Sequence, residues 1–189
     1  ADANKGKAIV GTVSGTSISF GTAVEFESGN TQEMNCAFGN GQVLIMYVDT
    51  GDTNTTKAIV GTVSGTSISF GTQVSSGWTY SNNPTAAYDS TADKFYFAFR
   101  DNLAGNYGSS AVITVTGTTP AFGSAVTFIS VDILAGGDPK LGVTYDPVAD
   151  KTVVAYYNGS LNKGYAVVAT IAGTTPSYGT AVIFNNNGD

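Results

Sequence analysis

The chain has 189 residues, of which 42% are apolar and 12% are charged, and its formal net charge is −6. This composition supports a folded core, but the eight Lys and Arg residues are too scattered to form the basic stripe that a nucleic-acid partner requires. No apolar run approaches the roughly 20 residues of a membrane-spanning helix, so we also expect no membrane insertion.

The first predicted element is a β-hairpin that the chain spells twice. The residues KAIVGTVSGTSISFGT occupy 7–22 and return unchanged at 57–72. Each copy has an alternating strand c, a Gly-Thr turn, and a strand d that ends in an aromatic residue followed by Gly. Weaker copies follow at 111–126 and 166–182. We call this unit the c–d hairpin.

A second unit, with strands a and b, alternates with the c–d hairpin at 35–49, 86–101 and 142–158. Strand b reads VLIMYV, FYFAF and TVVAYY in the three copies, and is therefore apolar on both faces. Such a strand is buried on both faces in a sheet that is covered from both sides. We therefore expect each strand b to lie between neighbouring sheets, with the Gly- and Thr-rich strand d at a partly exposed outer edge.

This order of units predicts an all-β chain with almost no helix. All-strand repeats of this length are typical of β-propellers, and another stacked repeat assembly is the alternative. We predict a single domain over 1–189, with a c–d hairpin at 7–27 and four-stranded antiparallel repeats at 33–75, 84–128 and 140–185. Propellers have about four to eight blades, so this propeller-like array of about three and a half is expected to be incomplete or completed by another chain.

The copies differ mainly in their b–c and d–a loops, whereas the c–d turns are nearly uniform. In a propeller blade the two variable loops share one edge, and loops on a rigid scaffold are where recognition is usually built. The candidate ligand-binding residues are Trp78, Tyr80, Asn82, Arg100 and Asp101. An aromatic ring beside amides and carboxylates suits sugar binding, because a sugar offers both CH groups and hydroxyls.

Structural roles compete with this interpretation. Trp78 would also fill a gap between two blades, and Arg100 would also form a local ion pair with Asp101. Asp49 is matched by Asp101 and Asn158 in the later repeats, which is typical of a side chain that caps the start of a turn.

The chain lacks His, which excludes a Ser-His-Asp triad and a His/Cys zinc site. Its single cysteine, Cys36, allows no internal disulfide and is expected to be a small buried thiol. We expect no cofactor and no metal. Calcium is an alternative only at Asp49 and Asp52, which lack the spacing and the closing Glu of an EF-hand loop.

Glycosidase chemistry requires two carboxylates that face one pocket. The chain has 14 Asp and Glu residues, so such a pair stays open as an alternative. However, Asp89, Asp93, Asp146 and Asp150 fall in the predicted a–b turns, where Asp closes turns well.

The pattern of Tyr-Asp…Asp-Lys at 88–94 and 145–151, an apolar strand, a loop and the c–d hairpin resembles repeats in large proteins of marine phages and their bacterial hosts. Several of those proteins look like tail-fibre or virion-surface components. The resemblance covers nearly the whole chain. It implies an extracellular or virion-surface location, self-association or contact with other fibre subunits, and a host-surface glycan as a candidate ligand. It transfers no catalytic residues.

We therefore predict a non-enzymatic structural and recognition module of a viral fibre or extracellular appendage. Nearly identical hairpins in tandem suit a scaffold better than an enzyme. A secreted carbohydrate-binding lectin is the first alternative, and a polysaccharide-degrading propeller enzyme is the second.

Overall fold

The computed structural model describes residues 4–79, 81–135 and 138–186. The regular structure in these residues consists of β-strands, which confirms the prediction of an all-β chain. No helix in this part of the chain could span a membrane.

In the described residues, the N-terminal hairpin consists of strands c and d. Its inner part pairs β1 with the first half of β4, and its tip pairs β2 with β3. The strands are β1 (Lys5–Ala8), β2 (Gly11–Ser14), β3 (Ser17–Phe20) and β4 (Val24–Gly39).

Sheet 1 begins with the second half of β4, and its outermost position is shared by two short strands. β5 pairs with β4 and β6, and β6 pairs on its other side with both β7 and β8. These strands are β5 (Gln42–Asp49), β6 (Thr55–Ser64), β7 (Ser67–Phe70) and β8 (Val74–Thr79). Strand d is therefore interrupted just after its aromatic residue, where Gly71 donates its N–H to Val60 O at 2.9 Å.

Sheets 2 and 3 repeat this plan, and a short hairpin connects them. Sheet 2 consists of β9 (Ser81–Asp89), β10 (Lys94–Asp101), β11 (Tyr107–Thr116), β12 (Thr119–Phe122) and β13 (Val126–Asp132). The connecting strands are β14 (Leu134–Ala135) and β15 (Asp138–Pro139). Sheet 3 consists of β16 (Leu141–Asp146), β17 (Lys151–Asn158), β18 (Lys163–Ala172), β19 (Thr175–Tyr178) and β20 (Val182–Asn185).

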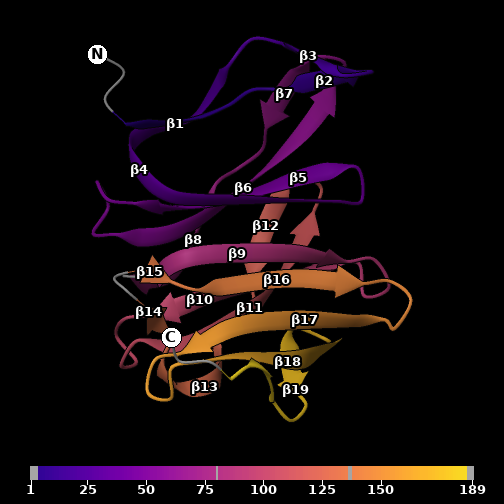
Figure 1. Cartoon of the computed structure of the whole chain (residues 1–189). Helices are drawn as coiled ribbons and strands as arrows, with labels where there is room; N and C mark the ends of the chain where they lie inside the picture. Colours follow the sequence, from indigo (N-terminus) through magenta and orange to yellow (C-terminus); the bar gives the residue numbers. More distant parts are fainter. Residues whose placement is uncertain (1–3, 80, 136–137, 187–189) are drawn as a thin grey trace.

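The N-terminal hairpin and the three sheets follow one another from the indigo end to the yellow end of Figure 1. The strands in position a, namely β4, β9 and β16, lie next to one another along this stack. An apolar cluster fills each of the three interfaces, and the buried members of these clusters come mainly from strands b and c. The core is thus divided into layers between sheets.

Burial of strand b depends on its place in the stack. β5 and β10 are buried on both faces over most of their length, as predicted. The prediction is wrong for β17, in which buried residues alternate with half-buried ones. One face of β17 packs on sheet 2, and no sheet of the described chain covers the other face.

The prediction of a buried thiol is also wrong, because Cys36 is exposed. Cys36 lies in the second half of β4, opposite Ile45 of β5. Residues next to each other in a strand point to opposite faces, and Ala37 packs toward sheet 2. Cys36 therefore points to the other side, where the described residues of the N-terminal hairpin include no strand a or b that could cover it.

Candidate functional site

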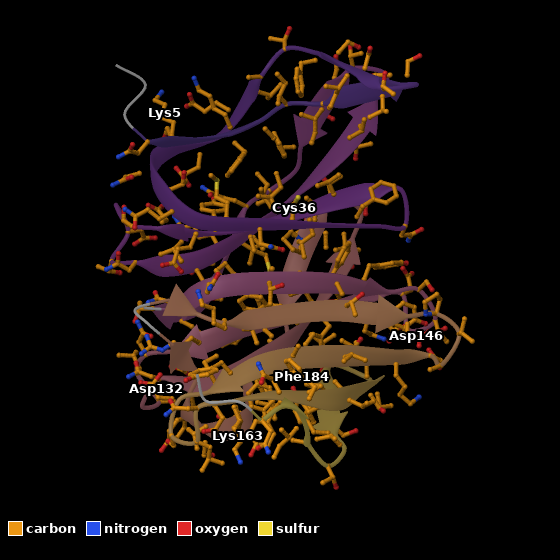
Figure 2. All side chains as sticks on the ribbon, in the orientation of Figure 1. Lys5, Cys36, Asp132, Asp146, Lys163 and Phe184 are labelled. Carbon is orange, nitrogen blue, oxygen red and sulfur yellow. The ribbon has the colours of Figure 1, made fainter. Side chains whose placement is uncertain are left out.

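The b–c and d–a loops meet at one edge of the stack, which we call the variable edge. Thr50 of a b–c turn donates its N–H to Asn30 O at 2.9 Å, and Gly159 of another donates to Asp132 O at 2.8 Å. Asn30 and Asp132 both belong to d–a connections. Figure 2 shows Asp132 and the a–b turn residue Asp146 at opposite edges. The loops that differ between repeats therefore lie together, away from the a–b turns.

One capping side chain begins each b–c turn at the variable edge. Its Oδ1 atom accepts hydrogen bonds from the backbone N–H groups two and three residues later, at 2.9–3.2 Å. The three caps are Asp49, Asp101 and Asn158. The predicted capping role is confirmed, and Asn158 shows that an amide performs it as well as a carboxylate.

An ammonium group bridges the two carboxylates where calcium was considered. Lys57 Nζ lies 2.7 Å from Asp49 Oδ2 and 3.1 Å from Asp52 Oδ2. Burial lowers the pKa of Lys57, but its hydrogen bonds to the two carboxylates outweigh burial and raise that pKa above its ordinary value. Among the described residues, no group of three His, Cys, Asp or Glu side chains is arranged to hold a metal ion.

A hollow of about 350 Å³ opens at the variable edge between sheets 1 and 2. One wall is the end of β8, and the other is the b–c turn of sheet 2. The lining residues are Gly77, Trp78, Thr79, Asp101, Leu103 and Ala104. Asp101 Oδ1 caps its own turn, whereas Oδ2 accepts no hydrogen bond from the part of the chain that the structure describes. The residues that line the hollow therefore include one with an aromatic ring and one with a carboxylate oxygen that is free to accept a hydrogen bond.

Trp78 belongs both to this hollow and to the core. Its ring stacks on Phe99 with a centroid separation of 5.4 Å and an interplanar angle of 16°, and it meets the edge of Phe122 at 5.5 Å. The half-buried ring thus fills the interface between two sheets, as one of the two interpretations of the sequence predicted. Its position is therefore fixed by packing before any ligand binds.

Arg100 and Asp101 point to opposite faces of sheet 2, because neighbouring residues of a strand alternate. Arg100 faces sheet 3 and is only 7% exposed. Its Nε atom lies 3.2 Å from Asp132 Oδ1, and its Nη1 atom donates to Asn102 Oδ1 at 2.7 Å. The prediction of an ion pair between Arg100 and Asp101 is wrong, because the partner of Arg100 is Asp132. The sequence did not single out Asp132 as a candidate.

The other two candidates are less informative. Asn82 lies opposite Arg100 in the register of β9 and β10 and does not line the hollow. Tyr80 lies outside the described residues. The structure thus brings together Trp78 and Asp101 of the five candidates. The structure also adds Thr79 and Leu103 to the lining of the hollow. In the sequence, the only signal for these two residues is that they lie close to Trp78 and Asp101 in variable loops.

The carboxylates of the a–b turns have structural partners, as expected. Asp89 and Asp146 accept backbone N–H groups two and three residues later at 2.8–3.1 Å. Tyr88 donates its hydroxyl to Asp93 at 2.6 Å, and Tyr145 donates to Asp150 at 3.0 Å. Burial and the Asp93 carboxylate raise the pKa of Tyr88 to about 12.

The chain matches no protein-family profile, no curated protein and no solved structure. Its candidate site is therefore defined by its own geometry.

Proposed function

We propose that this chain is a non-enzymatic structural and recognition module of a viral fibre or another extracellular appendage. In this proposal the sheets are propeller-like blades, which associate with one another or with other fibre subunits. The variable edge contacts a host-surface glycan. The observation that supports the proposal is the hollow beside Trp78. There, an aromatic ring whose position is fixed by packing lies near the Asp101 carboxylate, in loops that differ between repeats.

The chemistry of the hollow suits a neutral sugar. The Trp78 ring offers an apolar surface for sugar CH groups, and the Asp101 carboxylate offers an oxygen that accepts hydrogen bonds from hydroxyls. Acidic sugars fit less well, because the net charge of the chain is −6 and Asp101 is the charged residue among the described lining residues. A secreted lectin would use the same hollow, and fibre and lectin then differ in assembly rather than in ligand chemistry.

A polysaccharide-cleaving enzyme is a weaker proposal. Hydrolysis of a glycosidic bond usually requires two carboxyl groups about 5–9.5 Å apart on either side of the bond. Asp101 is the carboxylate among the described residues of the hollow, and Asp89 and Asp146 close turns at the other edge. We expect no release of reducing ends when the protein is incubated with marine polysaccharides.

The test is binding to a glycan array by the wild type and the variant Asp101→Asn. Asn keeps the turn cap, as Asn158 does, but removes the charge from the hollow. We expect selective binding of neutral glycans by the wild type and about tenfold weaker binding by the variant, because a hydrogen bond to a charged group is lost. Trp78→Ala is a poorer test, because it also opens the core between sheets 1 and 2.

The matched control is Asp146→Asn, which makes the same chemical change in a turn cap at the opposite edge. This variant should bind glycans as the wild type does. The proposal of a glycan site in the hollow fails if the wild type binds no glycan selectively, or if the two variants behave alike.

A further inference from the structure

The three interfaces between successive layers of the stack share one aromatic contact. A ring on the outer strand of one layer packs on two rings of the next, one from strand b and one from strand d. The centroid separations are 5.2 and 5.6 Å for Phe26 on Tyr47 and Phe70, 5.4 and 5.5 Å for Trp78 on Phe99 and Phe122, and 5.5 and 5.8 Å for Phe128 on Tyr156 and Tyr178. The stack is therefore directional, with a donating face and a receiving face on each layer.

At the two ends of the stack, the rings that correspond to this contact are exposed. Phe184 of sheet 3 corresponds to Phe26 and Phe128 on the donating face, yet its side chain is 65% exposed. Phe20 of the N-terminal hairpin corresponds to Phe70 and Tyr178 on the receiving face, and it is 61% exposed. Figure 2 shows Phe184 in the last layer, and Figure 1 shows that the N-terminal hairpin lies at the other end.

A second contact repeats between successive layers in the same direction, and it too is not formed at the ends of the stack. The Gly that follows the aromatic residue of strand d lies against the c–d turn of the next layer. A Cβ atom added there would lie 2.0 Å from Thr66 O at Gly21, 2.3 Å from Thr118 O at Gly71, and 2.4 Å from Thr174 O at Gly123. At Gly179 the nearest atom is Val168 O of the same sheet, at 3.8 Å. Among the described glycines, none lies against the corresponding turn residue of the N-terminal hairpin, Thr16.

Strand c shows the same relation. Val60 and Val112 on the donating faces are fully buried, whereas the corresponding Val168 is 41% exposed. On the receiving faces Ile59 is buried, whereas the corresponding Ile9 is exposed. Apolar residues of the same kind are thus covered inside the stack and uncovered at its ends.

We propose that the donating face of sheet 3, with Phe184 and Gly179, binds the receiving face of the N-terminal hairpin, with Phe20 and Thr16, on a second copy of this chain. The interface continues the three internal ones. This inference deepens the self-association in the proposed function and does not depend on a glycan ligand. Because the two faces differ, the contact is head-to-tail and adds copies into open arrays or rings.

The contact between copies is weaker than the internal ones. The described residues of the N-terminal hairpin include no strand b, so in this chain Phe184 would meet one receiving ring, Phe20, where each internal ring meets two. Association should therefore be reversible and depend on concentration. Closure within a single chain is a different arrangement, and it would require the opposite ends of the stack in Figure 1 to meet.

The test is sedimentation velocity of the whole chain over a range of concentrations, with a variant that blocks each face. Gly179→Ala adds a methyl group that the isolated chain accommodates but that would clash with the Thr16 carbonyl of the next copy. Phe20→Ser removes the receiving ring. We expect the wild type to form oligomers, and each variant to associate about ten- to hundredfold more weakly. Val148→Ser, at an exposed residue of an a–b turn, should associate as the wild type does.

An equimolar mixture of the two variants gives the sharper result. Each variant retains one intact face, so the mixture should form heterodimers as strongly as the wild type associates, and nothing larger. The proposal is overturned by a wild type that stays monomeric at all concentrations, by oligomers that neither variant weakens, or by longer oligomers in the mixture. Glycan binding by Gly179→Ala should be unchanged, so a failure of assembly is distinct from a failure of the proposed site.

Discussion

Strands β10 and β17 occupy the same position in successive repeats, and both are strongly apolar, yet they are buried differently. β10 lies between sheets 1 and 3 and is buried on both faces, whereas β17 is fully buried only on the face toward sheet 2. The hydrophobic effect acts on area removed from water, so an apolar face is stabilised only when a neighbour covers it. An apolar face by itself therefore does not show that a neighbour is present, and for sheet 3 the described chain covers only one face of β17.

The largest expected difference in stability between sheet 2, inside the stack, and sheet 3, at its end, concerns one aromatic ring in each sheet. Phe97 of β10 is fully buried and stacks on Phe99 with a centroid separation of 4.8 Å. Phe97→Ala should lower the free energy of unfolding by about 3–5 kcal/mol, because it leaves a cavity in the interface. Phe184→Ala should cost less than about 1 kcal/mol, since that ring is mostly exposed. Urea denaturation below the concentration at which copies associate measures both, and equal losses would contradict the layered core.

A smaller effect is expected at a pair of valines in strand c. Val112→Ala should cost about 2 kcal/mol, because the side chain is fully buried between sheets 2 and 3. Val168→Ala at the corresponding position should cost less than about 0.5 kcal/mol in the monomer. At concentrations where the wild type associates, only Val168→Ala should weaken association. A Val168→Ala variant as destabilised as Val112→Ala would show that the face of sheet 3 is covered within one chain.

The third prediction concerns pH. Burial between sheets 2 and 3 raises the pKa of the Tyr96 and Tyr178 phenols above the ordinary value of 10.0, and their hydroxyl oxygens lie 3.0 Å apart. Above about pH 10 the unfolded chain loses these protons while the folded chain keeps them. Stability should therefore be complete below pH 10 and fall above it, by up to about 1.4 kcal/mol per pH unit for each tyrosine.

Thermal unfolding at pH values from 8 to 11.5 measures this loss. Tyr96→Phe keeps the ring but removes one titrating group, so its stability should fall less steeply with pH. An unfolding midpoint that rises between pH 10 and 11 would contradict the buried phenols.

Local features of the candidate site could be predicted because neighbouring residues decide them. The caps at Asp49, Asp101 and Asn158 involve groups only two or three residues away. The role of Arg100 could not be predicted in this way, because its partner Asp132 follows 32 residues later, beyond two further strands. Strand alternation alone, however, places Arg100 and Asp101 on opposite faces and argues against a shared site.

The sequence by itself determined the all-β class, the repeating units and the turn caps, because periodicity, turn residues and short-range hydrogen bonds specify them locally. Only the tertiary structure decided which apolar faces are covered. It placed Trp78 in the core as well as at the hollow, exposed Cys36, and left the rings of Phe20 and Phe184 mostly exposed. The physical reason for this division is that burial of an apolar face depends on the next layer of the stack. The residues of a single strand do not determine whether that layer is present.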